Sequence, residues 1–399
     1  MKVTACIAIL VMALAVVDAR PTGHKGKLHN GKPHKGKKTG HIKVQNNPHY
    51  HPNAARQVVR SWRKFNKHTH SRIIGKIDAG IIPFTDDGND LEYYASVTVG
   101  TPGQTFKLDF DTGSADLWFP YTGCNSCSGK DIYDPTQSST YQADGRSWTI
   151  TYGDQSSSSG ILGTDTVDLG GLQITGQTID MADTISSQFQ SSVTDGLLGL
   201  AFDSLASVSG IQTPVDNLIS QNLISDPVFG VFLGKQSNGG GGEYVFGGYD
   251  QSKISGSLTA VPVDNSQGFW GITVDSLSVA GTSVGSFSGI IDTGTTLLLL
   301  TNDVASNLAS QLSATDNGDG TYTISCDAST LSDLTFSIGG GSFTIPAADL
   351  IFQNSGSSCT AGFGYNNMNF AILGDVFIKN NYVVFDQSTP QVHIAPLAF

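Results

Sequence analysis

The stretch Phe110-Asp111-Thr112-Gly113-Ser114 returns later in the chain as Ile291-Asp292-Thr293-Gly294-Thr295. Each copy ends an apolar run and is followed, after 88 and 82 residues, by two large aliphatic residues and a glycine, Leu197-Leu198-Gly199 and Ile372-Leu373-Gly374. A single Asp-Thr-Gly is more often an ordinary β-turn, because all three residues favour turns. Two matched pairs of motifs at similar spacing instead indicate a duplicated half whose copies each supply one carboxylate to a common site.

Further segments place the repeated motif in a known family. They are DFDTGSADLW (109–118), Tyr152-Gly153-Asp154, DGLLGL (195–200), YVFGGY (244–249) and AILGDVF (371–377). In this order they resemble the pepsin-like aspartic proteases, and especially the rhizopuspepsin group of mucoralean fungi, over residues 78–399. The resemblance implies an all-β, bilobal pepsin-like fold, in which two pseudo-two-fold-related β lobes enclose an active-site cleft.

The first nineteen residues have the pattern of a secretory signal peptide. Lys2 precedes an apolar run over residues 3–17, and the small-residue pattern Val17-Asp18-Ala19 follows. The apolar run is shorter than the ~20 residues that a membrane span needs. We therefore expect a secreted, extracellular protein that is not embedded in a membrane, with an acidic vacuole as the alternative location.

Residues 20–77 differ sharply in composition from the rest of the chain. Residues 20–76 contain fifteen Lys and Arg, eight His and no Asp or Glu, and their first part is low-complexity and too polar to form a core. Metal, heparin or nucleic-acid binding is disfavoured, because ligand-like spacing and interleaved aromatic residues are missing. Residues 53–67 carry Val58, Val59, Trp62 and Phe65 at helical spacing, which predicts a short amphipathic helix.

The remaining chain, residues 77–399, has the opposite charge. It holds six Lys and Arg against 33 Asp and Glu, a net charge of −27, next to a segment of +15. Such a division indicates an intramolecular partner that is held partly by charge and released when carboxylates become protonated. We therefore interpret residues 20–77 as a basic propeptide that binds the acidic body.

The body alternates apolar and polar residues in short runs separated by turn residues, which predicts an all-β protein. The main helical patterns cover residues 213–221 and 303–312. About 320 residues exceed a single comfortable core, so two lobes are expected. We place them at 78–250, with the first Asp-Thr-Gly and a flap, and at 251–399, with the second Asp-Thr-Gly.

Four of the five cysteines remain once Cys6 leaves with the signal peptide. Cys124 and Cys127 lie in one half, and Cys326 and Cys359 in the other, which fits two disulfides within lobes in an oxidising compartment. A zinc site at Cys124 and Cys127 is the weaker alternative, because no second ligand pair is close in sequence.

Carboxylates are the abundant acid and base groups of the body, which contains one histidine, His393. Residues 281–285 (GTSVG) match the serine-hydrolase elbow pattern but lie among strand residues, which favours a hairpin. Two aspartates brought together share one proton, an effect for which the aspartic-protease dyad is the standard example. The ionised Asp can activate water while the protonated Asp donates to the oxyanion, so neither metal nor cofactor is expected.

The resemblance assigns roles to individual residues. The catalytic pair is Asp111 and Asp292, and the groups that support it are Gly113, Ser114, Gly294 and Thr295. Flap and substrate-binding residues are Tyr152, Gly153, Asp154, Trp118, Phe189, Leu197 and Thr296, with Tyr152 hydrogen-bonded to Trp118. A plain surface hairpin and ordinary core residues are the alternatives for the flap and for the apolar wall. One departure from the family is Ala115, where many relatives have a second Ser.

We conclude from the sequence that this is a secreted aspartic endopeptidase made as a zymogen and active as a monomer at acid pH. It should cleave polypeptides at large apolar residues, and also after lysine because of Asp154. Its own propeptide should block the cleft, with Lys64 paired to the dyad and Lys67 as the second candidate. The alternative is a catalytically silent binding protein or inhibitor with the same fold.

Overall fold

Two β-sheets carry most of the chain that the computed structural model describes, namely residues 40–46, 53–65, 93–152, 156–235, 237, 240–356 and 358–398. These residues belong to one compact unit, Gly36–Phe399. The expected signal peptide, most of the expected propeptide and residues 153–155 lie outside the described ranges.

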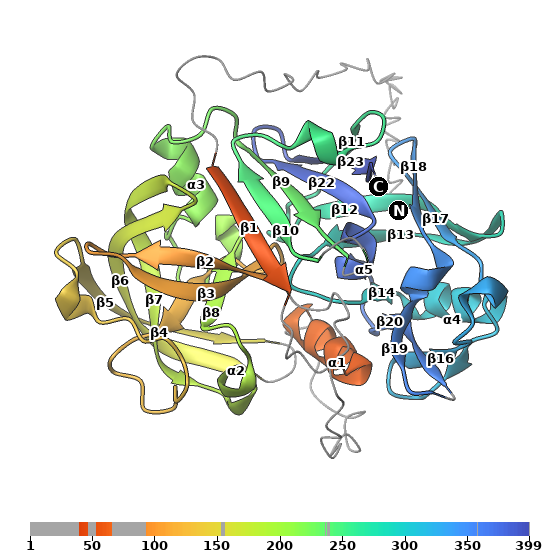
Figure 1. The fold of residues 1–399 in the computed structure, drawn as a ribbon, viewed down its shortest axis with the longest axis horizontal. Coiled ribbons are helices and arrows are strands. Elements are labelled where there is room, and N and C mark those ends of the chain that lie inside the picture. Colours follow the sequence, from red (N-terminus) through yellow and green to blue (C-terminus); the bar gives the residue numbers. More distant parts are fainter. Residues whose placement is uncertain are drawn as a thin grey trace, which may run out of the picture. The chain divides into compact units, whose positions relative to one another are not determined.

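The larger sheet has thirteen strands and includes segments from both halves of the chain. In spatial order they are β11 (Thr259–Pro262), β23 (Gln391–Pro396), β22 (Asn381–Asp386), β9 (Val228–Leu233), β10 (Gly242–Phe246), β1 (Gly40–Asn46), β2 (Tyr93–Val99), β3 (Gln104–Asp111), β8 (Gly196–Gly199), β4 (Leu117–Pro120), β7 (Leu172–Ile185), β6 (Ser157–Leu169) and β5 (Gln142–Thr151). Figure 1 shows β1, from the predicted propeptide, inserted between β10 and β2. The predicted propeptide segment thus contributes a strand to the larger sheet.

The second sheet belongs to the C-terminal half. Its order is β15 (Thr315–Asp316), β16 (Thr321–Ile324), β20 (Cys359–Tyr365), β14 (Leu298–Leu300), β21 (Ala371–Leu373), β13 (Thr282–Ile291), β12 (Gly271–Val279), β17 (Leu334–Ile338) and β18 (Gly341–Ile345), while β19 (Ile351–Asn354) pairs with β20.

The duplication read from the sequence is present in the strand pairing. In the first half, β3 runs parallel to β8, and β8 is antiparallel to β4. In the second half, β13 runs parallel to β21, and β21 is antiparallel to β14. Each Asp-Thr-Gly therefore follows a strand that pairs with its own apolar-apolar-Gly partner. The all-β, two-lobed prediction is confirmed.

Helices are few and short. They are α1 (Ala54–Phe65), α2 (Ser187–Ser191), α3 (Pro214–Ser220), α4 (Asn302–Gln311) and α5 (Asp375–Ile378), with 3-10 turns at Pro135–Gln137, Asp203–Leu205, Gln251–Lys253, Ala328–Thr330 and Ala347–Leu350. The three helices predicted from sequence correspond to α1, α3 and α4. Thr213 begins α3 with a capping box that includes Asp216, and Pro214 occupies the first turn. Within the described ranges, no helix is long and apolar enough to cross a bilayer.

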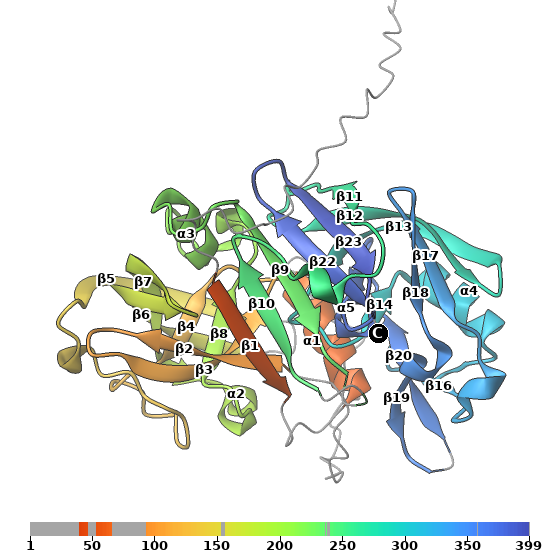
Figure 2. The same ribbon diagram turned by 45° about the horizontal axis from the view of Figure 1, so that its top comes forward.

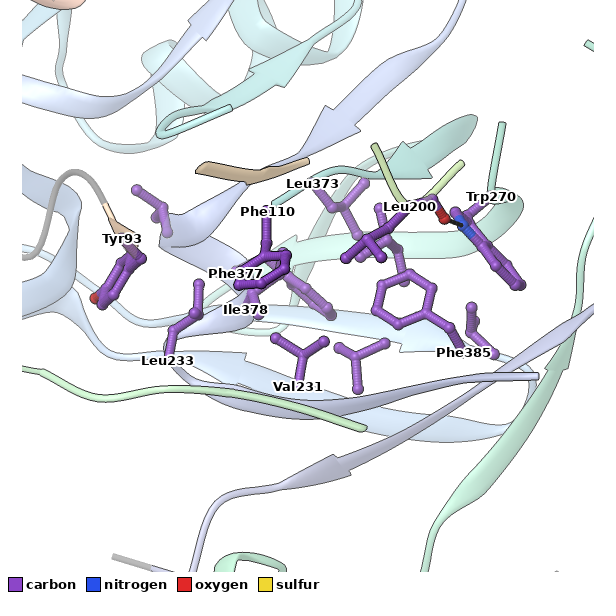
Figure 3. Packing of buried hydrophobic residues seen from close by; sticks show 14 of the residues in the cluster. Tyr93, Phe110, Leu200, Val231, Leu233, Trp270, Leu373, Phe377, Ile378 and Phe385 are labelled. Atoms are coloured by element: carbon purple, nitrogen blue, oxygen red, sulfur yellow. Dashed lines mark hydrogen bonds between the residues drawn. The ribbon is translucent and has the colours of Figure 1, made fainter. Parts of the chain in front are cut away.

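The core reaches the strands that carry the two Asp-Thr-Gly motifs. Phe110 precedes Asp111, Leu200 follows Gly199, and Leu373 precedes Gly374. Phe110, Leu200 and Leu373 are buried in one cluster with Phe377 and Phe385 (Figure 3). The indole nitrogen of Trp270, in the same cluster, donates to the carbonyl of Leu200 over 3.0 Å. Packing on both sides of the lobe junction therefore fixes the chain next to each motif.

Both predicted disulfides are present. Cys124 bonds to Cys127, and Cys326 bonds to Cys359, each within one half of the chain. Residue 250, where we placed the lobe boundary, lies between β10 and β11. Strands β22 and β23 return from the end of the chain to lie beside β9 and β11, so the sheet is continuous across that boundary.

Candidate active site

Each Asp-Thr-Gly loop holds its carboxylate with the same two donors. The amide of Gly113 donates to Asp111 Oδ1 over 2.8 Å, and the Ser114 hydroxyl donates to Oδ2 over 2.6 Å. The amide of Gly294 donates to Asp292 Oδ1 over 3.0 Å, and the Thr295 hydroxyl donates to Oδ2 over 2.6 Å. Both aspartates are fully buried. The four supporting groups that the resemblance assigns thus lie around the two carboxylates.

The middle threonines of the two motifs join the loops to each other. The amide of Thr112 donates to Thr293 Oγ1, and the amide of Thr293 donates to Thr112 Oγ1, each over 3.0 Å. Each hydroxyl in turn donates across the junction, from Thr112 to the carbonyl of Ile291 and from Thr293 to that of Phe110. Our sequence reasoning missed this role, although a Thr in both copies was the available signal.

The glycines after the aliphatic pairs allow the chain to pass close to these loops. A Cβ on Gly199 would come within 2.5 Å of the Ala115 backbone, and one on Gly374 would come within 2.5 Å of the Leu297 carbonyl. Real Cβ atoms do not approach backbone this closely, so only glycine fits at either position. The paired glycines are therefore a packing requirement of the two loops.

A lysine from the predicted propeptide segment contacts both carboxylates. The Lys64 ammonium lies 2.8 Å from Asp111 Oδ1 and 3.2 Å from Asp292 Oδ2, and the Lys64 side chain is buried. One turn earlier in α1, the Ser61 hydroxyl is 3.2 Å from Thr295 Oγ1. Since Thr295 donates its proton to Asp292, Ser61 is the donor in this contact. Figures 1 and 2 both show α1 between the strands of the two lobes.

The rest of the buried face of α1 packs on the C-terminal lobe. Ala54 and Val58 precede Ser61 and Lys64 at spacings of four and three residues, so they share one face of the helix. They belong to an apolar cluster with Ile290, Leu297, Leu299, Phe352, Met368 and Ile372. The helix is thus fixed by apolar packing along its length and by charge at the dyad.

The pKa values of the two carboxyl groups are shifted in opposite directions. Burial by itself raises the pKa of Asp111, but the Lys64 ammonium and the hydrogen bonds from Lys64 and Ser114 outweigh it and lower this pKa to about 2. At Asp292, burial and the negative charge of Asp111 raise the pKa, although Lys64 opposes them. Asp111 therefore carries the negative charge, while Asp292 is the member that more readily holds a proton.

Strands β5 and β6 pair with each other, and Tyr152 directly follows β5. Its hydroxyl accepts a hydrogen bond of 2.8 Å from the Trp118 indole nitrogen, as we expected. Phe189 packs edge-on against both Tyr152 and Trp118, and Leu197 belongs to the same apolar cluster. A pocket of about 500 Å³ adjoins them, lined by Lys64, Gly113, Ser114, Asp116, residues 149–152, residues 205–207 and Phe269.

Three other predicted site residues need separate mention. Gly153 and Asp154 lie outside the described residues. Thr296 is buried next to the second motif, and its carbonyl accepts a hydrogen bond from the amide of Val376 in α5. In the described part of the chain, no group of three or more His, Cys, Asp or Glu is arranged to hold a metal ion.

The fold and these paired loops define a pepsin-like aspartic protease. The model of the eukaryotic aspartyl protease family matches residues 92–397, and the chain belongs to that family. It is 54% identical to rhizopuspepsin-4 of Rhizopus niveus over 407 residues, covering 99% of this chain and 98% of that protein. It is 58% identical to syncephapepsin of Syncephalastrum racemosum over 358 residues, covering 88% and 90%. Pepsin A of Callithrix jacchus is 40% identical over 321 residues, covering 77% and 82%. The protein is thus an aspartic endopeptidase.

Proposed function

We propose that the protein is secreted as a zymogen and, after loss of its propeptide, hydrolyses proteins at acid pH through Asp111 and Asp292. The observation that carries this proposal is the buried contact of one propeptide ammonium with both carboxylates. A silent binding protein would have no use for a buried cation against two aligned carboxylates. The signal-like residues 1–19 and the two disulfides support secretion.

The chemistry follows from the shared proton. Once Lys64 has left, two buried carboxyls that interact this closely hold one proton between them. The ionised group takes a proton from a water molecule, this water attacks the peptide carbonyl, and the protonated group donates to the developing oxyanion. Ser114, Thr295 and the two glycine amides keep the carboxylates oriented during these transfers.

In the zymogen, two elements of the propeptide have separate tasks. Strand β1 completes the sheet between β10 and β2, with five registered pairs on one side and two on the other. Helix α1 fills the cleft and places Lys64 on the dyad. An extended polypeptide substrate cannot enter while α1 is present, so activity requires that the helix leave.

The substrate preference is proposed from the apolar cluster that contains Phe189, Leu197 and Tyr152, because Tyr152 also lines the pocket beside the dyad. A large apolar side chain before the scissile bond would bury its surface there, at about 25 cal/mol per Å². The sequence adds Asp154 at the flap tip, which we propose allows lysine to bind with its methylenes in the pocket and its ammonium at the rim. The active form is proposed to be a monomer.

The test is to purify the full-length secreted chain and incubate it at pH 7 and at pH 3.5. We expect an intact, inactive protein at pH 7. At pH 3.5 we expect a new N-terminus near residues 75–80, and then cleavage of a denatured protein substrate after large apolar residues and lysine. A chain that matures but cleaves no peptide at any pH would support the silent binding protein. Activity without processing at pH 7 would contradict the zymogen.

A further inference from the structure

A second pair of buried carboxyl groups lies outside the dyad, in the N-terminal lobe. Asp116 is five residues beyond Asp111, and Asp180 is in β7; the two side chains are 1% and 0% exposed. In the described part of the chain, Asp116 Oδ2 and both carboxyl oxygens of Asp180 are buried without a hydrogen-bond donor. Two carboxylates left this way in the interior would be very costly.

One shared proton satisfies these oxygens. The amide and hydroxyl of Ser207 donate to Asp116 Oδ1 over 2.9 and 2.6 Å, so donors already favour the ionised form of Asp116. Asp180 lacks such donors; in the strand ladder it lies opposite Trp118, which is two residues from Asp116 in sequence, and the Asp116 carboxyl is the neighbouring group that raises its pKa. Asp180 therefore holds the proton and donates it to Asp116 Oδ2.

The charges around the pair favour the same state. Burial raises the pKa of Asp180 well above its ordinary value, and the charge of Asp116 raises it further. The opposing charge is that of Arg146 on β5, whose exposed guanidinium is engaged by Asp144 through two hydrogen bonds of 2.8 Å. Leu162 of β6 lies opposite Asp180 and adds no charge. Asp180 should therefore stay protonated well above the pH at which exposed carboxyls ionise.

The pair also connects the two walls of the cleft. Ser207, which Asp116 holds, lines the 500 Å³ pocket beside the dyad. Asp180 lies directly opposite Trp118 in the β4–β7 ladder, and Trp118 donates to the flap residue Tyr152. We propose that Asp116 and Asp180 form a one-proton carboxyl pair that positions both cleft walls and makes their arrangement depend on pH. This role is independent of the zymogen proposal.

The sign of the pH dependence follows from the raised pKa. A carboxyl that binds its proton more tightly in the folded state stabilises the fold at acid pH, and this contribution is lost as the pH rises through the folded-state pKa. Above that pH, two adjacent carboxylates lie in an apolar cluster. The Ser207 wall and the Trp118–Tyr152 contact then lose their support, and the cleft opens toward neutral or alkaline pH.

The test uses the full-length chain and the variants Asp180→Asn and Asp116→Asn, with Asp183→Asn as the matched control. Asp183 is on the same strand but partly exposed. Infrared difference spectra at pH 7 should show a protonated-carboxyl stretch in the parent and the control that is missing from Asp180→Asn. Thermal midpoints should fall from pH 5 to pH 8 in the parent and control and change less in Asp180→Asn, whose amide cannot lose a proton in this range.

An Asp180→Asn variant that keeps the band, or whose thermal midpoints fall in parallel with those of the parent, would overturn the proposal. So would failure of both variants to fold at pH 5, because an Asn at either position supplies the neutral donor that the pair requires. In the activated enzyme, Asp180→Asn should also retain a larger fraction of its pH 4.5 kcat/KM at pH 6.5 than the parent does, by about threefold or more. A structural role without titration would lower kcat/KM equally at both pH values.

Discussion

The two Asp-Thr-Gly loops have the same hydrogen bonds but different surroundings. Each carboxylate accepts from a glycine amide and from a hydroxyl, and each loop binds the other through a threonine. Yet the pKa of Asp111 is low and that of Asp292 is raised. The difference comes from helix α1, because the Lys64 ammonium is closer to Asp111 than to Asp292, at 2.8 Å against 3.2 Å. The hydrogen bonds of the two loops are thus duplicated, whereas the pKa of each aspartate depends on its distance from Lys64.

The largest expected effect is the loss of activity when either carboxylate of the dyad is removed. Asp111→Asn and Asp292→Asn should each lower kcat by roughly 10³-fold or more, because one carboxyl cannot act as both base and acid around one water. The activity of acid-treated protein on a fluorogenic peptide measures this loss. The matched control is Asp183→Asn, which removes the same charge outside the cleft and should retain activity. Substantial turnover by either folded dyad variant would disprove the assignment.

Removing the asymmetric neighbour tests the origin of the pKa difference. Lys64→Ala leaves the buried carboxylates without their cation, a loss of about 3 kcal/mol or roughly 10²-fold in the population of the closed form. The full-length variant should therefore cleave peptide slowly at pH 6, where the parent is silent. Lys43→Ala, an exposed lysine of β1, removes the same charge away from the dyad and should stay silent.

The sign of the pH effect sharpens this prediction. With its pKa held at about 2, ionised Asp111 stabilises the closed form above its ordinary pKa of 3.8, and this contribution is lost only as the pH falls toward 2. Release near pH 4 must then begin with other carboxylates that face the basic segment. If Lys64→Ala is as silent as the parent and Lys67→Ala is too, no lysine plug exists.

The two threonines that join the loops should each contribute to the free energy of unfolding. Thr112→Val and Thr293→Val each leave a buried amide without its acceptor and remove a hydroxyl donor to a buried carbonyl, which costs about 1–3 kcal/mol. The Phe110 carbonyl keeps the Tyr244 hydroxyl as a donor in Thr293→Val, so this variant should lie toward the lower end of the range. Urea unfolding of the full-length chain at pH 6 measures the loss. Thr105→Val, exposed on β3, should change stability by no more than about 0.5 kcal/mol. Very unequal losses for the two buried threonines would show that the loops are not supported symmetrically.

Much of this arrangement could be read from the sequence, because it rests on local motifs repeated at similar spacing. The strand before each Asp, the aliphatic partner and the close-packed glycine follow from residue types and order. The Thr112–Thr293 contact could not be read in the same way, since it joins residues 181 positions apart. The proposed Asp116–Asp180 pair could not be predicted either, because its two residues are also far apart in the sequence. The difference in pKa between the two aspartates depends on where the Lys64 side chain lies, which composition alone does not specify.

The smallest expected effect concerns the predicted flap of the N-terminal lobe. Asp154, predicted from sequence to lie at its tip, should pair with a substrate lysine whose methylenes lie along Phe189 and Leu197. A partly exposed pair of this kind contributes on the order of 1 kcal/mol, or roughly fivefold in kcat/KM. Asp154→Thr should lose this factor on a peptide with Lys before the scissile bond and lose little on its Phe counterpart. Asp131→Thr, which removes an exposed carboxylate elsewhere, should change kcat/KM on neither peptide.

Because Asp154 must be ionised, the lysine preference of the parent should fade below pH ~3.5, near the reference pKa of an aspartate. Equal losses on both peptides would mean that Asp154 shapes the hairpin without recognising charge.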